Sequence, residues 1–281
     1  MATAVARPSA PQFANNLSEL LSDRALVERE LQAILPTPTA SPVSACMEYA
    51  VMGEGQRLRP LLAIRSGNLL GSEGALTLRA AAATELLHCA SLIVDDLPCM
   101  DNDATRRNRP SAHIAYGEST ALLAAFGLVA LAARTVIEQE ASEAFWGGQR
   151  RFQISLLSTL DCASLIGGQV MDLELSGVRR EQCRDLLNDL KTVPLFVLSV
   201  EAAVAYAPSS VHAGLKQFGR HFGVALQMAD DYLDGEAPEI GPLEGQLALT
   251  KDCLAPYGAA ARPLEDLVEY LHARAQDYRY R

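Results

Sequence analysis

Two clusters of aspartates interrupt a chain that is otherwise patterned as apolar helices. Each cluster ends an apolar, helical stretch: Asp95, Asp96 and Asp101 stand in DDLPCMD, and Asp230, Asp231 and Asp234 stand in DDYLD. Burying so many carboxylates without compensation is costly, because each ion loses its hydration. Hard oxygen ligands with room for water suit Mg²⁺ that bridges to substrate phosphates. The fold is therefore expected to hold cations and a diphosphate between two facing helices.

Apolar residues recur with helical spacing almost throughout the chain, and strand signals are nearly absent. Alanine and leucine, both good helix formers, dominate the pattern. It predicts helices over residues 17–34, 42–52, 59–70, 75–97, 119–140, 149–174, 180–206, 210–234, 243–254 and 262–277. We therefore expect an all-α fold, a single-domain bundle of about ten or more helices around a central apolar cavity.

The domain organisation follows from the absence of a linker in the middle of the 281 residues. We expect one domain over residues 17–281 and a flexible tail over residues 1–16. The tail contains two prolines and no acid, so a transit-peptide remnant is the alternative reading. The six cysteines lack zinc-type CxxC pairs and lie in or beside apolar runs, as in reduced cytosolic proteins. A cytoplasmic location is expected, or a plastid one if the tail is such a remnant.

Bulk composition excludes two classes of protein. The formal net charge of −10 argues against general nucleic-acid binding, which needs a basic surface. No uninterrupted apolar run approaches the ~18 residues of a membrane span, so no transmembrane segment is expected. The hydrophobic content of 49% is sufficient for a sizeable core.

The second cluster has clean helical geometry. Gln227, Asp230 or Asp231, and Asp234 follow the i, i+3/i+4, i+7 spacing and form one polar stripe. Like charges four residues apart destabilise a bare helix, so a compensating partner is expected. The alternative is a solvated helix end.

The aspartates of the first cluster can come together only where the helix is distorted. Asp95 and Asp101 are six residues apart and do not share a helical face, but Pro98 breaks the turn and allows Asp101 to fold back toward Asp95. His88 and Ser91 lie upstream on the stripe that leads to Asp95. A solvated acidic loop is the alternative. Either cluster alone could be a solvated helix end or loop, but two such clusters in one helical chain are harder to explain by coincidence.

Several basic residues are candidates for phosphate contacts. Guanidinium groups bind phosphate in a bidentate manner, which favours Arg106 and Arg107 and, after a glycine-containing turn, Arg57 and Arg59. Lys191 precedes Pro194, which should kink the helix and turn the lysine inward. For each, an ordinary surface side chain is the alternative. Gly167 and Gly168 are explained by close helix packing, and Asn108 tolerates the left-handed conformation of a sharp loop.

Together these residues resemble the trans-isoprenyl diphosphate synthases, the polyprenyl synthetase family of the farnesyl and geranylgeranyl diphosphate type. The resemblance covers roughly residues 17–235 and runs, in the family's order, through GQRLRP, ELLHCASLIVDDLPCMDNDATRRNRPSAH, YGE, LIGGQVMDLE, LKTVPLF and LQMADDYLD. The two aspartate motifs with the trailing arginine pair are its most specific parts. It identifies residues 17–281 as a polyprenyl synthetase domain.

The resemblance implies a role for each matching residue. Mg²⁺, three ions with substrate bound, would be held by Asp95, Asp96 and Asp101 on one side of an allylic diphosphate and by Asp230, Asp231 and Asp234 on the other. Arg106, Lys191 and Gln227 would contact that diphosphate, with Thr192 near the reacting carbon. The isopentenyl diphosphate site would comprise position 56, Arg57, His88 and Arg107. Small residues one turn before the first aspartates, Ala90 and Ser91, imply a product longer than farnesyl, with geranylgeranyl favoured.

The chain also departs from the family pattern. Gln56 replaces a phosphate-binding lysine, Asn108 replaces a glycine, the helix after YGE lacks an acidic element, and the loop over residues 235–246 has no lysine or arginine. Each lost charged contact is worth on the order of 1.5–3 kcal/mol.

Three functions therefore compete. The leading one is an active prenyltransferase that condenses isopentenyl diphosphate with an allylic diphosphate. The second is a non-catalytic partner subunit of an active synthase, and the third is a class I terpene cyclase, against which DDYLD argues. The resemblance implies a homodimer, with a heterodimer as the alternative. The apolar helix over residues 119–140 is its candidate interface, unless that helix is fully buried within one subunit.

Overall fold

The computed structural model describes residues 10–175, 179, 182–208, 213–235, 237 and 239–276. Within these residues the chain is almost entirely helical, as predicted, and its one small sheet is a two-stranded hairpin. The N-terminal half contains α1 (Ala10–Ile34), the 3₁₀ turn η1 (Pro38–Ala40), α2 (Pro42–Val51), α3 (Leu58–Leu70), α4 (Gly74–Asp95), β1 (Thr105–Arg106), β2 (Arg109–Pro110), α5 (Ala112–Tyr116) and α6 (Glu118–Ile137). The remainder contains α7 (Glu143–Ser158), α8 (Leu165–Glu174), α10 (Arg184–Lys191), α11 (Val193–Val204), α12 (Ala213–Leu233), α13 (Gly241–Asp252), the 3₁₀ segment η2 (Ala255–Ala261) and α14 (Arg262–Gln276).

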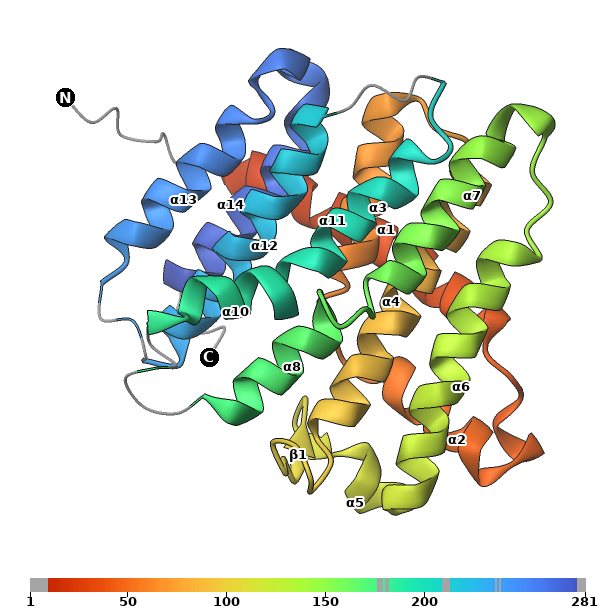
Figure 1. Ribbon diagram of the computed structural model, residues 1–281. Helices are drawn as coiled ribbons and strands as arrows, with labels where there is room; N and C mark the ends of the chain where they lie inside the picture. The colour runs from red at the N-terminus through yellow and green to blue at the C-terminus, as the bar shows by residue number, and fades with distance from the viewer. Residues whose placement is uncertain are drawn as a thin grey trace.

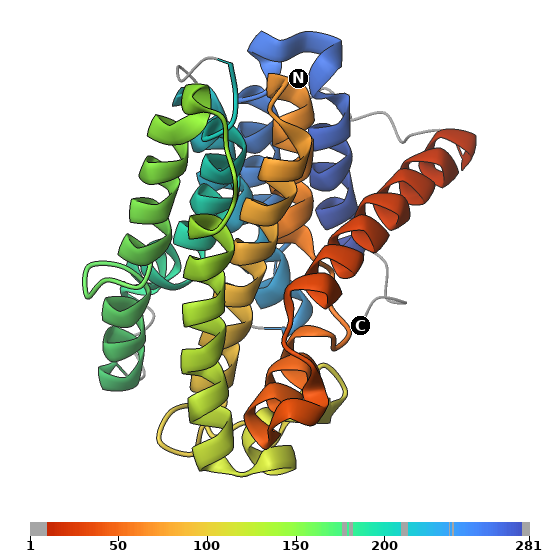
Figure 2. The same cartoon turned by 90° about the vertical axis from the view of Figure 1, so that its right-hand side faces the viewer.

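Helix α4 is the central element of the bundle. It packs against α6, α3 and α11, and α1 crosses the outside of the bundle (Figures 1 and 2). The alanines at positions 80–83 are fully buried, so neighbouring helices approach its backbone closely. The Glu73 side chain accepts a hydrogen bond from the Leu76 amide at 2.7 Å and caps its start. At its other end α4 carries the first aspartate cluster.

Two apolar clusters form the core. One surrounds α4 and α6, and the other surrounds α12, α13 and α14 with Phe196, Phe218 and Phe222 at its centre. Helices α4 and α12 run in the same direction in Figure 1, so the two aspartate clusters lie toward the same end of the molecule. This arrangement brings together residues that are about half the chain apart.

Several helix bounds differ from those predicted. Helix α1 begins at Ala10, within the segment expected to be a tail; residues 1–9 lie outside the described part. The helix expected over 149–174 is two helices, α7 and α8, separated by a turn at residues 159–164. The helix expected over 180–206 divides at Thr192 into α10 and α11, and Pro194 lies in the first turn of α11 as the predicted kink requires.

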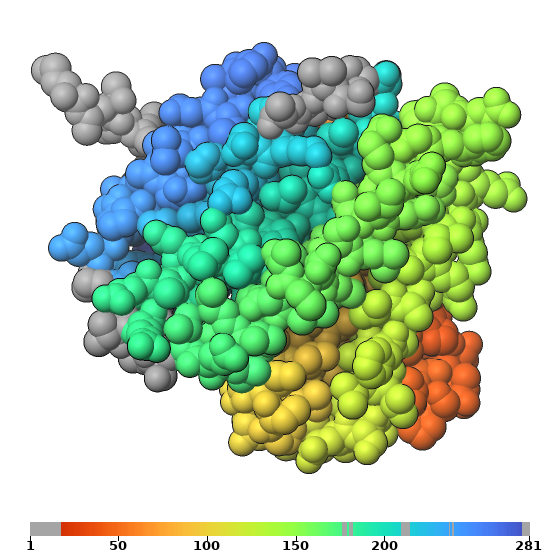
Figure 3. Space-filling model, viewed as in Figure 1, coloured from red at the N-terminus to blue at the C-terminus, as the bar shows by residue number. Residues whose placement is uncertain are grey.

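Within the part of the chain that the structure describes, two helices, α4 and α6, are long and apolar enough to span a membrane by length and composition. In the bundle, 67% of the apolar window of α4 is buried against other helices, which identifies it as a core helix. For α6 the share is 44%, because one of its faces is open. Figure 3 shows α6, α7 and α8 side by side at the surface.

Candidate active site

The first aspartate cluster occupies the end of α4 and the loop that follows. The Asp101 amide donates a 2.9 Å hydrogen bond to the Asp95 carbonyl, so the loop folds back as Pro98 predicted. Asp96 is 2% exposed and accepts a 2.9 Å hydrogen bond from Nε of Arg106. Asp101 is exposed. The aspartates and the following arginine therefore form one local unit.

Asp95 is the least compensated member of this cluster. Burial raises its pKa to about 6, and the negative charges of Asp101 and Asp96 act in the same direction against the opposing charge of Lys191. Burial likewise raises the pKa of Asp96, although Arg106 opposes the shift. A site of this kind gains stability when a cation binds.

The second cluster lies on the last turn of α12, where arginines from other elements meet it. Arg274 of α14 lies 2.6 Å from Asp230, and Arg184 of α10 lies 3.7 Å from Asp231. Gln227 donates a 2.8 Å hydrogen bond to Asp231 from one turn away, and Asp234 is exposed. These contacts supply the compensation that the like-charged stripe predicted. Neither Arg184 nor Arg274 was expected from the sequence, since both are distant from the motif along the chain.

The break between α10 and α11 presents Lys191 as predicted. Its Nζ lies 2.5 Å from Asp172 on α8, and its charge lowers the pKa of Asp95. The Thr192 hydroxyl bonds to Gln227 at 3.0 Å, which joins the break to α12. Close packing sets the position of α10, because a Cβ at Gly168 would lie 2.8 Å from Cβ of Leu190 and 2.9 Å from Cγ of Lys191.

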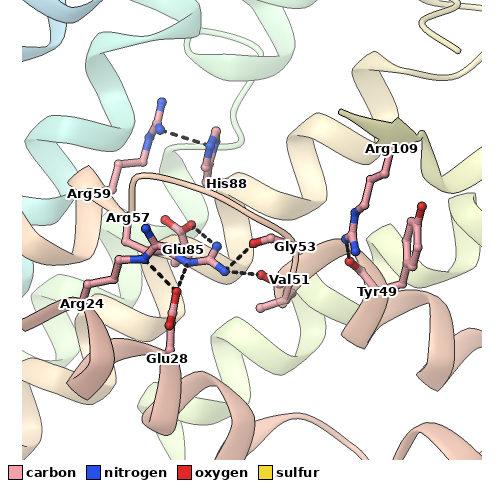
Figure 4. A network of polar contacts seen from close by, with 10 residues as sticks. All are labelled: Arg24, Glu28, Tyr49, Val51, Gly53, Arg57, Arg59, Glu85, His88 and Arg109. Atoms are coloured by element: carbon pink, nitrogen blue, oxygen red, sulfur yellow. Dashed lines mark hydrogen bonds and ion pairs between the residues drawn. The ribbon is translucent and has the colours of Figure 1, made fainter. Parts of the chain in front are cut away.

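The two arginines of GQRLRP have different environments (Figure 4). Arg57 is buried and bonds to Glu85 at 2.9 Å and to the carbonyls of Val51 and Gly53 at 2.6 and 2.9 Å. It adopts a left-handed conformation, with φ of 55°, at the start of α3. Its guanidinium therefore serves an internal network. The assignment of Arg57 to isopentenyl diphosphate remains a prediction that this geometry does not favour.

The Arg59 side chain points toward His88 and away from the network around Arg57. Its Nη1 lies 3.1 Å from Nε2 of His88, and its guanidinium lies 4.5 Å from the centre of the Phe196 ring. Burial lowers its pKa to about 10, opposed by Glu85 and Asp230 and assisted by Arg107. Burial and then Arg59 and Arg107 hold the pKa of His88 well below its usual range. Two half-buried basic side chains, each with a lowered pKa, suit an anion.

A hairpin fixes the arginine pair. Arg106 pairs with Arg109, and the two residues between them, Arg107 and Asn108, have φ values of 53° and 61°. Positive φ at both central positions is the signature of a type I′ turn, in which asparagine substitutes well for glycine. Asn108, which replaces a glycine of the family pattern, therefore preserves the geometry of the turn. Arg107 lines a groove of about 710 Å³, together with Arg24, Glu54, Gln56 and Arg274.

The donor chemistry of the two clusters fits Mg²⁺. Among the described residues, no three histidine, cysteine, aspartate or glutamate side chains are already gathered as a metal site. Asp96 and Asp230 are paired with arginines, and burial of the Asp95 carboxylate raises its pKa to about 6. Oxygen donors with open positions match the preference of Mg²⁺. Asp95, Asp96, Asp101, Asp230, Asp231 and Asp234 are the residues that would hold it.

The two residues expected to set product length, Ala90 and Ser91, lie near the end of α4. Ala90 is 3% exposed, and the Ser91 hydroxyl bonds to the His88 carbonyl at 2.8 Å. Leu87 and Cys89 are buried nearby, whereas Phe126 is 65% exposed and does not close a cavity within the subunit.

Comparison with known proteins shows the family to which the chain belongs. The family model for polyprenyl synthetase matches residues 41–240. The chain is 30% identical over 269 residues to geranylgeranyl pyrophosphate synthase 4 of Arabidopsis thaliana, covering 92% of this chain and 71% of the relative. It is 33% identical over 233 residues to farnesyl diphosphate synthase of Bacillus subtilis, covering 80% and 78%. Its fold matches a geranyltransferase from Legionella pneumophila with a TM-score of 0.86 and 30% identity, covering 94% of this chain and 98% of that one.

Proposed function

Because the chain belongs to the polyprenyl synthetase family, we propose that it joins isopentenyl diphosphate head-to-tail to an allylic diphosphate. The observation that carries the proposal is the link between the two aspartate clusters. Lys191 acts by its charge on Asp95 of the first cluster, and the adjacent Thr192 hydroxyl bonds at 3.0 Å to Gln227, which bonds to Asp231 of the second. Asp230 and Arg107 both act by their charges on Arg59. Anionic and cationic groups thus alternate across one site, as two bound diphosphates and their metal ions require.

The side chains divide between two diphosphates. Arg106, Lys191 and Gln227 would contact the allylic diphosphate, with Thr192 near its reacting carbon. Arg59, His88 and Arg107 would hold the isopentenyl diphosphate. When bound to the six aspartates, Mg²⁺ would neutralise charge on the leaving diphosphate. Arg57 would keep the turn before α3 in place through Glu85.

The proposed reaction balances without a side-chain nucleophile. The allylic C–O bond breaks, and the diphosphate leaves with the electron pair. The double bond of isopentenyl diphosphate attacks the resulting carbocation and forms the new C–C bond. A proton then leaves the extended chain, and the released diphosphate is an adequate acceptor. The protein's part is to orient both substrates and to exclude water from the carbocation.

The proposed product is geranylgeranyl diphosphate, with farnesyl diphosphate as the shorter alternative. Ala90 and Ser91 support the longer product, because small side chains leave room beside α4 for a growing chain. Relatives named for either product are similar to this chain.

A non-catalytic partner subunit is the second candidate. Gln56 and the loop over residues 235–246 favour it, since both lack cations of the family pattern. The arginines that meet Asp230 and Asp231 favour the active enzyme, because they restore positive charge around the second cluster. The third candidate, a terpene cyclase, would consume no isopentenyl diphosphate.

A turnover assay on the purified chain separates the three candidates. It would contain Mg²⁺, labelled isopentenyl diphosphate and, in separate reactions, dimethylallyl, geranyl or farnesyl diphosphate. We expect prenyl alcohols longer than the primer after dephosphorylation, and loss of product in the variants Asp95→Ala and Asp230→Ala. A folded protein that elongates no primer would overturn the proposal and favour a partner subunit. Cyclised product without uptake of label would favour the cyclase.

A further inference from the structure

The hairpin that carries Arg107 is too small to hold its own shape. Its strands, β1 and β2, comprise only Thr105–Arg106 and Arg109–Pro110, and an isolated two-stranded hairpin is at best marginally stable in water. Arg107 also has a φ of 53°, a left-handed conformation that is strained for a residue with a side chain. Such a conformation persists only where the surrounding structure imposes it, so neighbouring elements must hold this turn.

Tyr49 of α2 holds β2 from outside the hairpin. Its hydroxyl donates a 2.7 Å hydrogen bond to the Pro110 carbonyl, and its own carbonyl accepts a hydrogen bond from the Arg109 guanidinium. That guanidinium lies 3.8 Å from the centre of the Tyr49 ring, which is within range of a cation–π interaction. Figure 4 shows the two side chains lying against each other. We call this pair of residues the Tyr49–Arg109 clamp.

Two glycines of the turn before α3 leave room for the arginines of the hairpin. A Cβ at Gly53 would meet the Arg109 guanidinium, with Cζ only 2.8 Å away, and a Cβ at Gly55 would lie 3.0 Å from Cζ of Arg107. Neither glycine is among those with a positive φ, so close approach of the arginines, and not backbone conformation, explains them. The clamp and the turn therefore fix the hairpin on the same side.

The two arginines of the pair are held in different ways. Arg106 bonds through its guanidinium to Asp96 at 2.9 Å and to Asp103 at 3.0 Å. Within the described part of the chain, no group forms a hydrogen bond or ion pair with the Arg107 guanidinium, which acts by its charge on Arg59 and His88. The position of Arg107 thus depends on the hairpin backbone and on whatever holds that backbone.

We propose that Tyr49 and Arg109 are positioning residues, which hold the hairpin so that Arg107 is directed at isopentenyl diphosphate. The proposal rests on the proposed function, because it takes Arg107 as a contact of that substrate. The clamp acts through Arg107 and does not itself touch the diphosphate. Arg106 keeps its own anchor in Asp96, so loss of the clamp should weaken binding of isopentenyl diphosphate far more than binding of the allylic diphosphate.

Calorimetric titration of the full chain with Mg²⁺ present measures the two affinities separately and without turnover. In Tyr49→Leu and in Arg109→Gln, the dissociation constant for isopentenyl diphosphate should rise roughly tenfold, and that for geranyl diphosphate by less than about twofold. Tyr49→Phe keeps the ring and loses only the hydroxyl, so its effect should be smaller. Arg79→Gln, which removes a half-exposed arginine paired with Glu30, is the matched control and should change neither value.

A double-variant cycle shows whether the clamp acts through Arg107. In an Arg107→Gln background, Tyr49→Leu should cause no further loss of affinity for isopentenyl diphosphate, because the residue that it positions is already absent. Arg109→Gln carries the same test if Tyr49→Leu does not fold, which thermal unfolding checks. A purely structural role would weaken both diphosphates and would act equally in both backgrounds, and either result overturns the proposal.

The remaining outcomes separate this proposal from the proposed function. Unchanged affinity for isopentenyl diphosphate in both Tyr49→Leu and Arg109→Gln overturns the positioning role alone. A wild type that binds isopentenyl diphosphate but elongates no primer overturns the proposed function, and the same affinities still decide the role of the clamp. A wild type that does not bind isopentenyl diphosphate overturns both.

Discussion

The Asp95 carboxylate stands at the end of α4, where burial disfavours its charge more than Lys191 and Arg106 stabilise it. Its folded-state pKa is about 6, against 3.8 for the free side chain. Between these values the folded protein holds a proton that the unfolded chain has lost, so the stability of the metal-free protein should fall as the pH rises from about 4 to about 6. Asp95→Asn removes this cost. At pH 7.5 without Mg²⁺ it should be more stable than wild type by about 1–2 kcal/mol, allowing for solvent screening.

Thermal unfolding with and without Mg²⁺ checks this prediction. Wild type should gain stability from Mg²⁺, whereas Asp95→Asn should gain less and should lose activity by roughly 10²-fold or more. A metal-free Asp95→Asn protein that is less stable than wild type at pH 7.5 would contradict the account of Asp95 as a carboxylate whose charge is disfavoured by burial.

The two arginines of GQRLRP allow a matched comparison. Arg57→Gln leaves the buried Glu85 without its ion-pair partner and should lower the free energy of unfolding by about 3 kcal/mol. Arg59→Gln should change stability by less than ~1 kcal/mol, since burial of that charge is already poorly compensated, and should raise the KM for isopentenyl diphosphate roughly tenfold. Chemical denaturation and steady-state kinetics measure the two effects. If Arg57→Gln instead raised the KM with little loss of stability, and Arg59→Gln lowered stability with little change in KM, Arg57 would be reassigned to the substrate site.

Close packing of α8 against α10 makes the position of Lys191 sensitive to one methyl group. In Gly168→Ala the new Cβ would meet Leu190 and Lys191 at 2.8–2.9 Å, so α10 must shift. We expect a loss of about 1–3 kcal/mol of stability and roughly a 10²-fold loss of kcat/KM, because Lys191 moves from its contact with Asp172 and its charge shifts relative to Asp95. Gly245→Ala in α13 is the control. Its Cβ meets no atom within 4 Å, so stability should rise by about 0.5–1 kcal/mol with activity unchanged. Equal activity of both variants would show that the position of α10 is not important.

Most of the helices follow from apolar periodicity, but some boundaries do not. The break between α7 and α8 falls in TLDCAS, which contains neither glycine nor proline, so nothing in the sequence marked it. The break at Thr192 was predictable because Pro194 cannot continue the preceding helix. The strands of the hairpin are two residues long and carry no alternating pattern, so only the left-handed preference of Asn108 pointed to a turn.

Some residues of the site could be predicted from the sequence and others could not, for a similar reason. The aspartate clusters and the inward position of Lys191 come from local spacing and one proline. Which of Arg57 and Arg59 faces His88 depends on the left-handed φ of Arg57 at the start of α3, which spacing alone does not specify. Arg274 was missed because its contact with Asp230 joins two helices that are distant in sequence.

One face of the subunit is unusually apolar. Figure 3 shows α6, α7 and α8 at one surface of the subunit. Apolar side chains on these three helices are 41–65% exposed: Leu122, Leu123, Phe126, Ile137, Trp146, Ile154, Leu157, Ile166, Val170 and Leu173. On the predicted interface helix, Leu131 is instead buried and Val129 is half-buried. Large apolar patches on a soluble protein mark interaction surfaces, and a second copy of the chain is the occupant we propose.

Substitution of Phe126 by glutamate tests the assembly. Phe126 is 65% exposed on α6, so Phe126→Glu costs little within a subunit but would place a charge at the centre of a two-fold interface. Sedimentation velocity should show a dimer for wild type and a monomer for Phe126→Glu at micromolar concentration. Leu249→Glu, at a 52% exposed position on α13, should remain dimeric. Because α6 also packs against α4, which carries Asp95, loss of the dimer should lower activity as well. A monomeric wild type would overturn the homodimer, whereas a dimeric Phe126→Glu protein would assign the interface to another face.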